Sequence, residues 1–259
     1  MARDYDLFVI INLQHDSADD IKNRWLDIDA DRATMEQIRN IYQEIWHRLA
    51  NTFKDYDQHL IFESMNEVME EGNYGTPTAS TWENINTLNQ MFVDVVRSVT
   101  GNESRFLMVP GYYNLIDQTV SDNFVMPRYD RDYQYEMVVV HVFDPYNFTL
   151  DEGVGSRTEV TIDDLKYLDT QLEKMHRKFV ENGIPVVVGE FGAIDKDNLP
   201  DIKKYVRGFV NAAKVNDIGY LYWDNGYDGK YGLALWNRYT YMPTTLGKML
   251  IPILTDKSI

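Results

Sequence analysis

Short apolar runs alternate along the chain with longer stretches in which apolar side chains recur every three or four residues. The short runs predict β-strands buried on both faces, and the longer stretches predict amphipathic helices. Six strands are predicted, at residues 7–11, 59–63, 105–109, 137–141, 184–192 and 218–223. Strands that alternate with helices in this way indicate an α/β fold with a parallel sheet and right-handed crossovers.

The helical stretches carry start and stop signals. Thr161 and Asp164, three residues apart, predict a capping box, Pro200 suits the first turn of a helix, and Gly101 and Gly183 follow helical stretches. The predicted helices cover residues 35–53, 85–99, 162–179, 200–215 and 243–254. Because no linker or low-complexity tract interrupts the alternation, residues 1–259 are predicted to form one domain.

The strand at residues 184–192, IPVVVGEFG, ends on a carboxylate, Glu190. A charged group at the end of a buried strand is costly unless it has a partner or a function. Two explanations of Glu190 are open: it forms an ion pair with a nearby cation, or it has a catalytic role. The flanking Gly189 and Gly192 favour the second, because glycine lets a ligand or another segment approach closely.

Chemistry in parallel α/β folds gathers at the carboxyl ends of the strands. Those ends read NLQHD at 12–16, SMNE at 64–67, HVFDPYNFT at 141–149, Glu190, and WDN at 223–225. Glu67 and Glu190 therefore end different strands. Two such carboxylates, one ionised and one protonated, are what glycoside hydrolysis requires.

The composition of the chain excludes several kinds of metal site, cofactor and partner. Cysteine is absent, which excludes disulfides and thiolate metal sites, and no zinc-protease, nucleotide-binding or dinucleotide-binding motif occurs, so no metal or cofactor is expected. The formal net charge of -16 argues against nucleic acid and anionic membranes as partners. The 13% aromatic content fits carbohydrate stacking as well as core packing, and Trp236 and Tyr146 are candidates for either role.

Four motifs in this order, IFESMNE, HVFDPYNFT, PVVVGEFG and YLYWDNG, resemble the successive strand ends of glycoside hydrolase family 5. HVFDPYNFT and GLALWNR are most similar to its endoglucanase and xyloglucanase branch. The resemblance spans nearly the whole chain and implies part of a (β/α)8 TIM-type barrel with about six βα units. The family's first two units are absent, because residues 7–11 correspond to its third strand.

The resemblance also implies a role for each strand-end residue. Glu67 would be the acid/base and Glu190 the nucleophile of a retaining mechanism, and Asn66 would contact the sugar 2-hydroxyl. His141 would assist this site and Trp223 would form the sugar platform.

Three departures from the family pattern point to low activity. Gln14, followed by His15, stands where the family usually has a histidine, and Phe143 replaces a tyrosine that donates to the nucleophile. The family's arginine belongs to the absent units. A positioned donor at a reacting centre contributes roughly two to three orders of magnitude in rate.

Two functions therefore remain open: a retaining endo-β-glycosidase acting on cellulose, β-glucan or xyloglucan, and a catalytically impaired relative that binds polysaccharide. Family resemblance favours secretion, although the chain shows no signal peptide. With six strands, the first and last would expose apolar edges, which predicts a homo-oligomer that covers them. A fragment of a longer gene is the other explanation for the open barrel.

Overall fold

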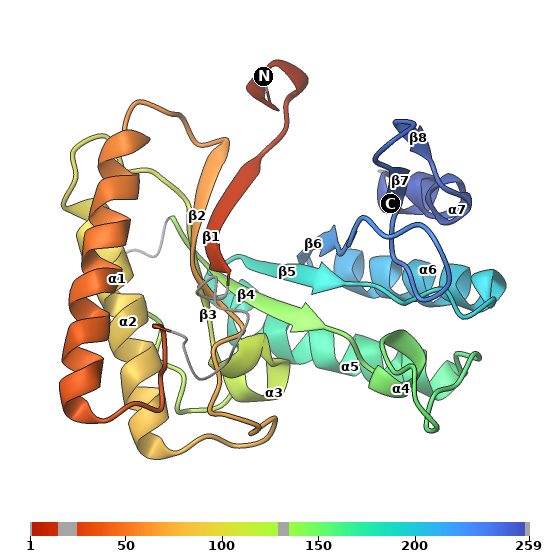
Figure 1. Cartoon of the computed structure of the whole chain (residues 1–259), viewed down its shortest axis with the longest axis horizontal. Helices are drawn as coiled ribbons and strands as arrows, with labels where there is room; N and C mark the ends of the chain where they lie inside the picture. Colours follow the sequence, from red (N-terminus) through yellow and green to blue (C-terminus); the bar gives the residue numbers. More distant parts are fainter. Residues whose placement is uncertain (1, 15–24, 129–134, 257–259) are drawn as a thin grey trace. The chain divides into compact units, whose positions relative to one another are not determined.

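The computed structural model describes residues 2–14, 25–128 and 135–256. The chain divides into two compact units (Figure 1). The first unit consists of Met1–Val139 with Gly183–Pro185, and the second of Val140–Asn182 with Val186–Ile259. The prediction of a single domain stays a prediction.

The first unit is built on parallel strands that follow one another in chain order. Each strand is hydrogen-bonded to the next along the chain, and β4 continues into the second unit. The strands are β1 (Val9–Gln14), β2 (Leu60–Asn66), β3 (Leu107–Pro110) and β4 (Glu136–Val142). The longer helices are α1 (Arg32–Thr52) and α2 (Ala79–Arg97), and the short ones are η1 (Ala2–Tyr5), η3 (Tyr112–Asn114) and α3 (Ile116–Thr119).

An aromatic core joins the two long helices of this unit, which lie side by side in Figure 1. Trp46 of α1 contacts Phe92 of α2 edge-on with ring centroids 4.5 Å apart, and both side chains are fully buried. Arg105, also buried, donates hydrogen bonds to the carbonyl oxygens of Phe53 and Leu60, each at 2.8 Å. These bonds satisfy backbone acceptors that burial would otherwise leave unpaired.

The second unit pairs β5 (Val186–Phe191) with β6 (Gly219–Tyr222) in parallel. Phe191 of β5 stacks on Phe209 of α6 with ring centroids 3.8 Å apart, which fixes α6 against the strand. The helices of this unit are α4 (Tyr146–Thr149), α5 (Ile162–Lys178), η4 (Val180–Asn182), α6 (Leu199–Val215) and α7 (Thr245–Leu254). A small hairpin, β7 (Trp236–Asn237) and β8 (Met242–Pro243), precedes α7.

The hydrophobic pattern predicted these elements well. All six strands occur within a few residues of their predicted positions, and so do the five long helices. The capping box is confirmed, since Thr161 accepts from the Asp164 N–H while the Asp164 carboxylate accepts from the Thr161 N–H. The short helices and the β7–β8 hairpin were missed, because they are too short to show a period.

One strand differs from its prediction. The run at residues 7–11 was expected to be buried, yet Leu7, Phe8 and Val9 are 56%, 57% and 40% exposed. Among the described residues of the first unit β1 pairs with β2 alone, so no described strand of that unit lies along its other edge. On α1, Ile41 is also exposed, although it is one of the apolar residues whose spacing predicts that helix.

In the described parts of the chain, no helix combines the length and the apolar character needed to cross a membrane.

Candidate active site

Glu67 directly follows β2 and is held by the end of the neighbouring strand. Its backbone N–H donates to Oδ1 of Asn114 at 2.9 Å, and Asn114 is fully buried at the end of η3, just beyond β3. Both residues have positive φ, 47° for Glu67 and 51° for Asn114. Side chains rarely adopt this conformation unless the surroundings hold them there. The hydrogen bond therefore fixes the direction in which the Glu67 side chain leaves the backbone.

Asn66, the last residue of β2, has an unusual environment. Its side chain is 3% exposed, and among the described residues neither the amide nitrogen nor the amide oxygen has a hydrogen-bond partner. Buried polar groups are nearly always paired, by protein or by a bound molecule. An amide with a free donor and a free acceptor is suited to bind a ligand hydroxyl group.

The loop after Glu67 is anchored by a second carboxylate, Glu70. The Glu70 side chain accepts hydrogen bonds from the Thr78 N–H at 2.6 Å and from the Thr81 hydroxyl and the Asn73 amide, each at 2.7 Å. Burial alone would raise the pKa of Glu70, but these bonds to the ionised form outweigh it and lower the pKa to about 2. The Glu70 N–H in turn donates to the hydroxyl of Tyr112. The loop that carries Glu67 is thus tied to both α2 and the end of β3.

In the second unit, His141 and Glu190 lie together. His141 is on β4 and Glu190 on β5, and Nδ1 of the imidazole is 3.7 Å from Oε2 of the carboxylate. Their side chains are 5% and 13% exposed, so water reaches both only in part. When protonated, the imidazole stabilises the carboxylate, and the low surrounding polarity strengthens that attraction.

The loop after β6 comes close to the end of β5. The Trp223 N–H donates to the Phe191 carbonyl at 2.9 Å, and the Trp223 side chain is half-buried. A Cβ atom on Gly192 would lie 2.7 Å from the end of the Leu233 side chain, so a larger residue there would force that side chain to shift. Of the two glycines whose presence favoured a catalytic role for Glu190, Gly192 is therefore also explained by packing.

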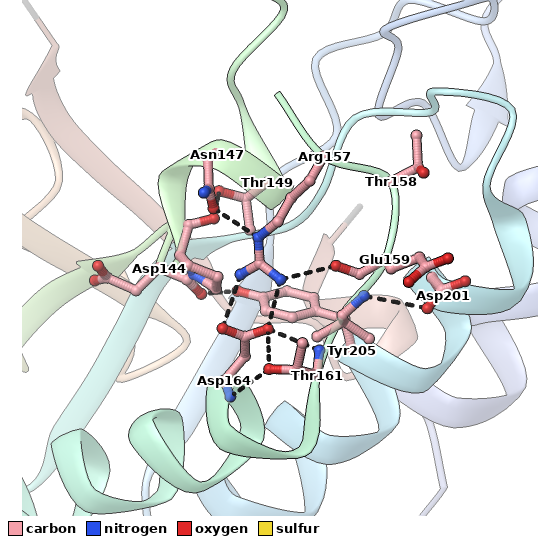
Figure 2. A network of polar contacts seen from close by, with 12 residues as sticks. Asp144, Asn147, Thr149, Arg157, Thr158, Glu159, Thr161, Asp164, Asp201 and Tyr205 are labelled. Carbon is pink, nitrogen blue, oxygen red and sulfur yellow. Dashed lines mark hydrogen bonds and ion pairs between the residues drawn. The ribbon is translucent and has the colours of Figure 1, made fainter. Parts of the chain in front are cut away.

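Phe143, directly after β4, is held by the polar network that Figure 2 shows. Its carbonyl accepts from the Thr149 hydroxyl, and the carbonyl of the next residue, Asp144, accepts from the Tyr205 hydroxyl at 3.1 Å. Arg157 makes two hydrogen bonds of 2.7 Å to the Asp164 carboxylate at the start of α5. The loop at residues 143–161 is thereby fixed to α5 and α6.

The predicted site residues fall into both units. The first contains Glu67 and Asn66, and the second contains Glu190, His141, Phe143 and Trp223. Gln14 ends β1, where its exposed side chain accepts from the Asn12 amide at 3.4 Å. His15 lies outside the described residues. Glu67, His141 and Glu190 carry carboxylate and imidazole groups, which can ligate a metal but also perform acid–base chemistry without one.

Sequence reasoning missed Asn114 and the anchoring carboxylates Glu70 and Asp164 as supports of the site. Asn114 lies soon after a predicted strand, so the rule that functional residues gather at the carboxyl ends of strands could have identified it. Glu70 lies inside a loop, where acidic residues are common, and the capping box identified Asp164 as a helix start but not as the partner of Arg157.

A model of the family described as cellulase (glycosyl hydrolase family 5) matches residues 1–229. The chain belongs to glycoside hydrolase family 5. Among its curated relatives, Endoglucanase A of Paenibacillus barcinonensis is 36% identical over 258 residues, which cover 90% of this chain and 64% of that protein. This family 5 chain therefore spans less than two thirds of that relative's length.

Solved structures of glycoside hydrolase family 5 confirm the fold class as part of a (β/α)8 barrel. A family 5 xyloglucanase from Paenibacillus pabuli, in complex with a ligand, matches with a TM-score of 0.89 and 33% identity, covering 98% of this chain and 76% of its own. A lichenase mutant from Caldicellulosiruptor sp. F32 with bound cellotetraose matches with a TM-score of 0.87 and 31% identity, over 98% of this chain and 70% of its own.

The ion pair in Figure 2 makes the stability of this region depend on pH. The hydrogen bonds from Arg157 lower the pKa of Asp164 to about 2, against 3.8 ordinarily. A carboxyl group with a depressed folded-state pKa stabilises the protein above its unfolded pKa, and this contribution disappears as the pH falls from about 4 to about 2. We expect Asp164→Asn to lower the free energy of unfolding by about 2 kcal/mol at pH 7 and by much less at pH 2.5.

Urea unfolding of both proteins at the two pH values measures this difference. Asp163→Asn is the matched control, because the adjacent Asp163 side chain is 89% exposed and its ion pair with Lys166 contributes little. An equal destabilisation by Asp164→Asn at both pH values would contradict the electrostatic explanation.

Proposed function

We propose that the chain is a retaining endo-β-glycosidase that cleaves β-1,4-glucan-type polysaccharides, with Glu190 as nucleophile and Glu67 as acid/base. The observation that carries the proposal is the partly buried Glu190 at the end of β5 with the His141 imidazole 3.7 Å away, in a chain of glycoside hydrolase family 5. Glu67 ends a different parallel strand, and carboxyl ends of parallel strands face the same side of a barrel.

The mechanism is a double displacement. Glu190 attacks the anomeric carbon while Glu67 donates a proton to the leaving glycosidic oxygen, which gives a glycosyl-enzyme ester and a shortened polysaccharide. Glu67 then removes a proton from water, which attacks the same carbon and releases Glu190. Each step inverts the anomeric carbon, so the two together retain the β configuration. The unpaired amide of Asn66 is suited to bind a hydroxyl group of the sugar, and the half-buried ring of Trp223 is suited to stack beneath it.

The substrate class follows from charge and from the relatives. A chain with a net charge of -16 repels anionic polymers, so a neutral glucan fits best. The similar proteins are named endoglucanase, xyloglucanase and lichenase, which all act on neutral β-glucans. Such polymers do not enter cells intact, which favours an extracellular place of action. Residues 1–259 would act as one domain.

A catalytically impaired polysaccharide-binding protein is the second candidate. It is favoured by Phe143, which has no hydroxyl to donate to Glu190, and by Gln14, which has no imidazole. Binding through Trp223 and Asn66 would persist in such a protein, and hydrolysis would be absent.

Removal of either carboxylate tests the mechanism. We expect Glu190→Gln and Glu67→Gln each to lower kcat on β-glucan by more than about a thousandfold, because each step needs both groups. Reducing-sugar release measures the rate, and proton NMR of the first product establishes the anomeric configuration. Glu71→Gln, an exposed residue of the same loop, is the control. Full activity in Glu190→Gln, or an α-anomeric first product, would refute the proposal.

Phe143→Tyr tests whether a missing donor limits the rate. A single donor at a reacting centre contributes roughly a hundredfold to a thousandfold, and a tyrosine introduced without its supporting shell should recover part of that. We expect kcat to increase about tenfold while the melting temperature changes little, since Phe143 is only half-buried. An unchanged kcat would indicate that another group already donates to Glu190.

We also propose that a second copy of the chain covers the open edge of β1. Leu7, Phe8 and Val9 are exposed there, and a groove of about 450 Å³ lies beside them, lined in part by Phe53 and Tyr56. Light scattering at micromolar concentration should give the mass of a dimer, and Phe8→Lys should give that of a monomer. Tyr167→Lys, on the exposed face of α5, is the control. A monomeric mass for the unmodified chain would exclude this interface.

A further inference from the structure

The hairpin β7–β8 displays a group of aromatic side chains. Tyr239 and Tyr241 are 94% and 81% exposed, and Trp236 is 47% exposed. We name these three residues the aromatic hairpin. They lie beyond residue 229, where the match to the family model ends.

This hairpin is connected directly to the residue beside Trp223. The carboxylate of Asp224 accepts hydrogen bonds from the N–H groups of Leu235 and Trp236 at 2.9 and 3.3 Å. Arg238, within the hairpin, donates to the Asp224 carbonyl at 3.2 Å. Asp224, the residue after Trp223, thus holds the start of the hairpin close to the end of β6.

The backbone of the hairpin is extensively hydrogen-bonded in spite of its exposure. Asn237 accepts from the N–H groups of Tyr239 and Thr240 through its side chain, each at 3.0 Å, and from Tyr241 through its carbonyl at 2.9 Å. The first turn of α7 packs so closely that a Cβ atom on Gly247 would lie 1.9 Å from the Leu235 carbonyl oxygen. A hairpin backbone that is ordered before binding loses little conformational entropy when a ligand arrives.

The backbone at Tyr241 carries strain that its side chain does not relieve. Its φ is 57°, a conformation that glycine or asparagine adopts more readily than tyrosine, yet the ring is exposed and contributes little packing. The turn of the hairpin requires this conformation, since the Tyr241 N–H closes it by donating to the Asn237 carbonyl at 2.9 Å.

We propose that the aromatic hairpin is a binding site for a neutral β-glucan chain that continues from the Trp223 end of the active site. Exposed tyrosine and tryptophan rings stack on the apolar faces of sugars, and their polar atoms bond to hydroxyl groups. This inference deepens the proposed function and rests on it for the identity of the polymer. A protein partner or a second copy of the chain is the competing occupant.

The test measures binding without hydrolysis. Native affinity electrophoresis through gels that contain mixed-linkage β-glucan or xyloglucan gives the dissociation constant of the full chain in a Glu190→Gln background. Tyr239→Ala combined with Tyr241→Gly should weaken polymer binding about tenfold, and cellobiose binding by a smaller factor. The melting temperature should stay the same or rise, because glycine relieves the strain at position 241. Tyr167→Ala, an exposed tyrosine on α5, is the matched control.

Each outcome has a distinct meaning. Unchanged polymer binding in the double variant overturns the inference, even if the unmodified chain hydrolyses β-glucan and the proposed function stands. A lower melting temperature, or a change in mass by sedimentation, also overturns it in favour of a packing or oligomer role. Weaker polymer binding in a chain that shows no hydrolysis supports the inference and refutes the catalytic proposal.

Discussion

The cost of a partly buried carboxylate at the end of a buried strand is the constraint on which the second unit depends. Glu190 is 13% exposed on a strand of valines, and such a charge is stable only where opposite charge or hydrogen-bond donors face it. The imidazole of His141 on β4 is one such group. Strand β4 must therefore keep His141 beside Glu190. The hydrogen bonds to the carbonyl groups of Phe143 and Asp144 hold the segment that follows this strand.

A carboxylate that accepts several hydrogen bonds anchors each of three loops. The Glu70 carboxylate accepts hydrogen bonds from the loop after β2. The Asp164 carboxylate accepts them from Arg157 and from the start of α5, and the Asp224 carboxylate accepts them from the loop after β6. In each case one carboxylate gathers donors that the loop would otherwise leave unpaired. The acidic composition of the chain thus has a structural use, in addition to its repulsion of anionic polymers.

Strands and helices could be predicted because their periods are local properties of the sequence. The valines of β5 and the spaced apolar residues of α1 identify those elements without any tertiary information. Glu67 and Glu190 could be located by the strand-end rule, and the family resemblance gave them roles. The rest depends on tertiary contacts. Nothing in the sequence shows that Asn114 reaches the Glu67 N–H, because that depends on which segments become neighbours.

The chain has two exposed surfaces rich in apolar side chains, and the chemistry of each indicates a different kind of binding partner. The start of β1 presents Val9 and the preceding Leu7 and Phe8, and no described strand of the first unit pairs with its outer edge, which suits another polypeptide. The aromatic hairpin presents rings that carry polar atoms on two strands of only two residues each, which are too short to pair firmly with a further strand. A sugar chain needs stacking faces and hydroxyl partners and makes no use of a free strand edge. The first surface therefore fits assembly and the second fits a polysaccharide.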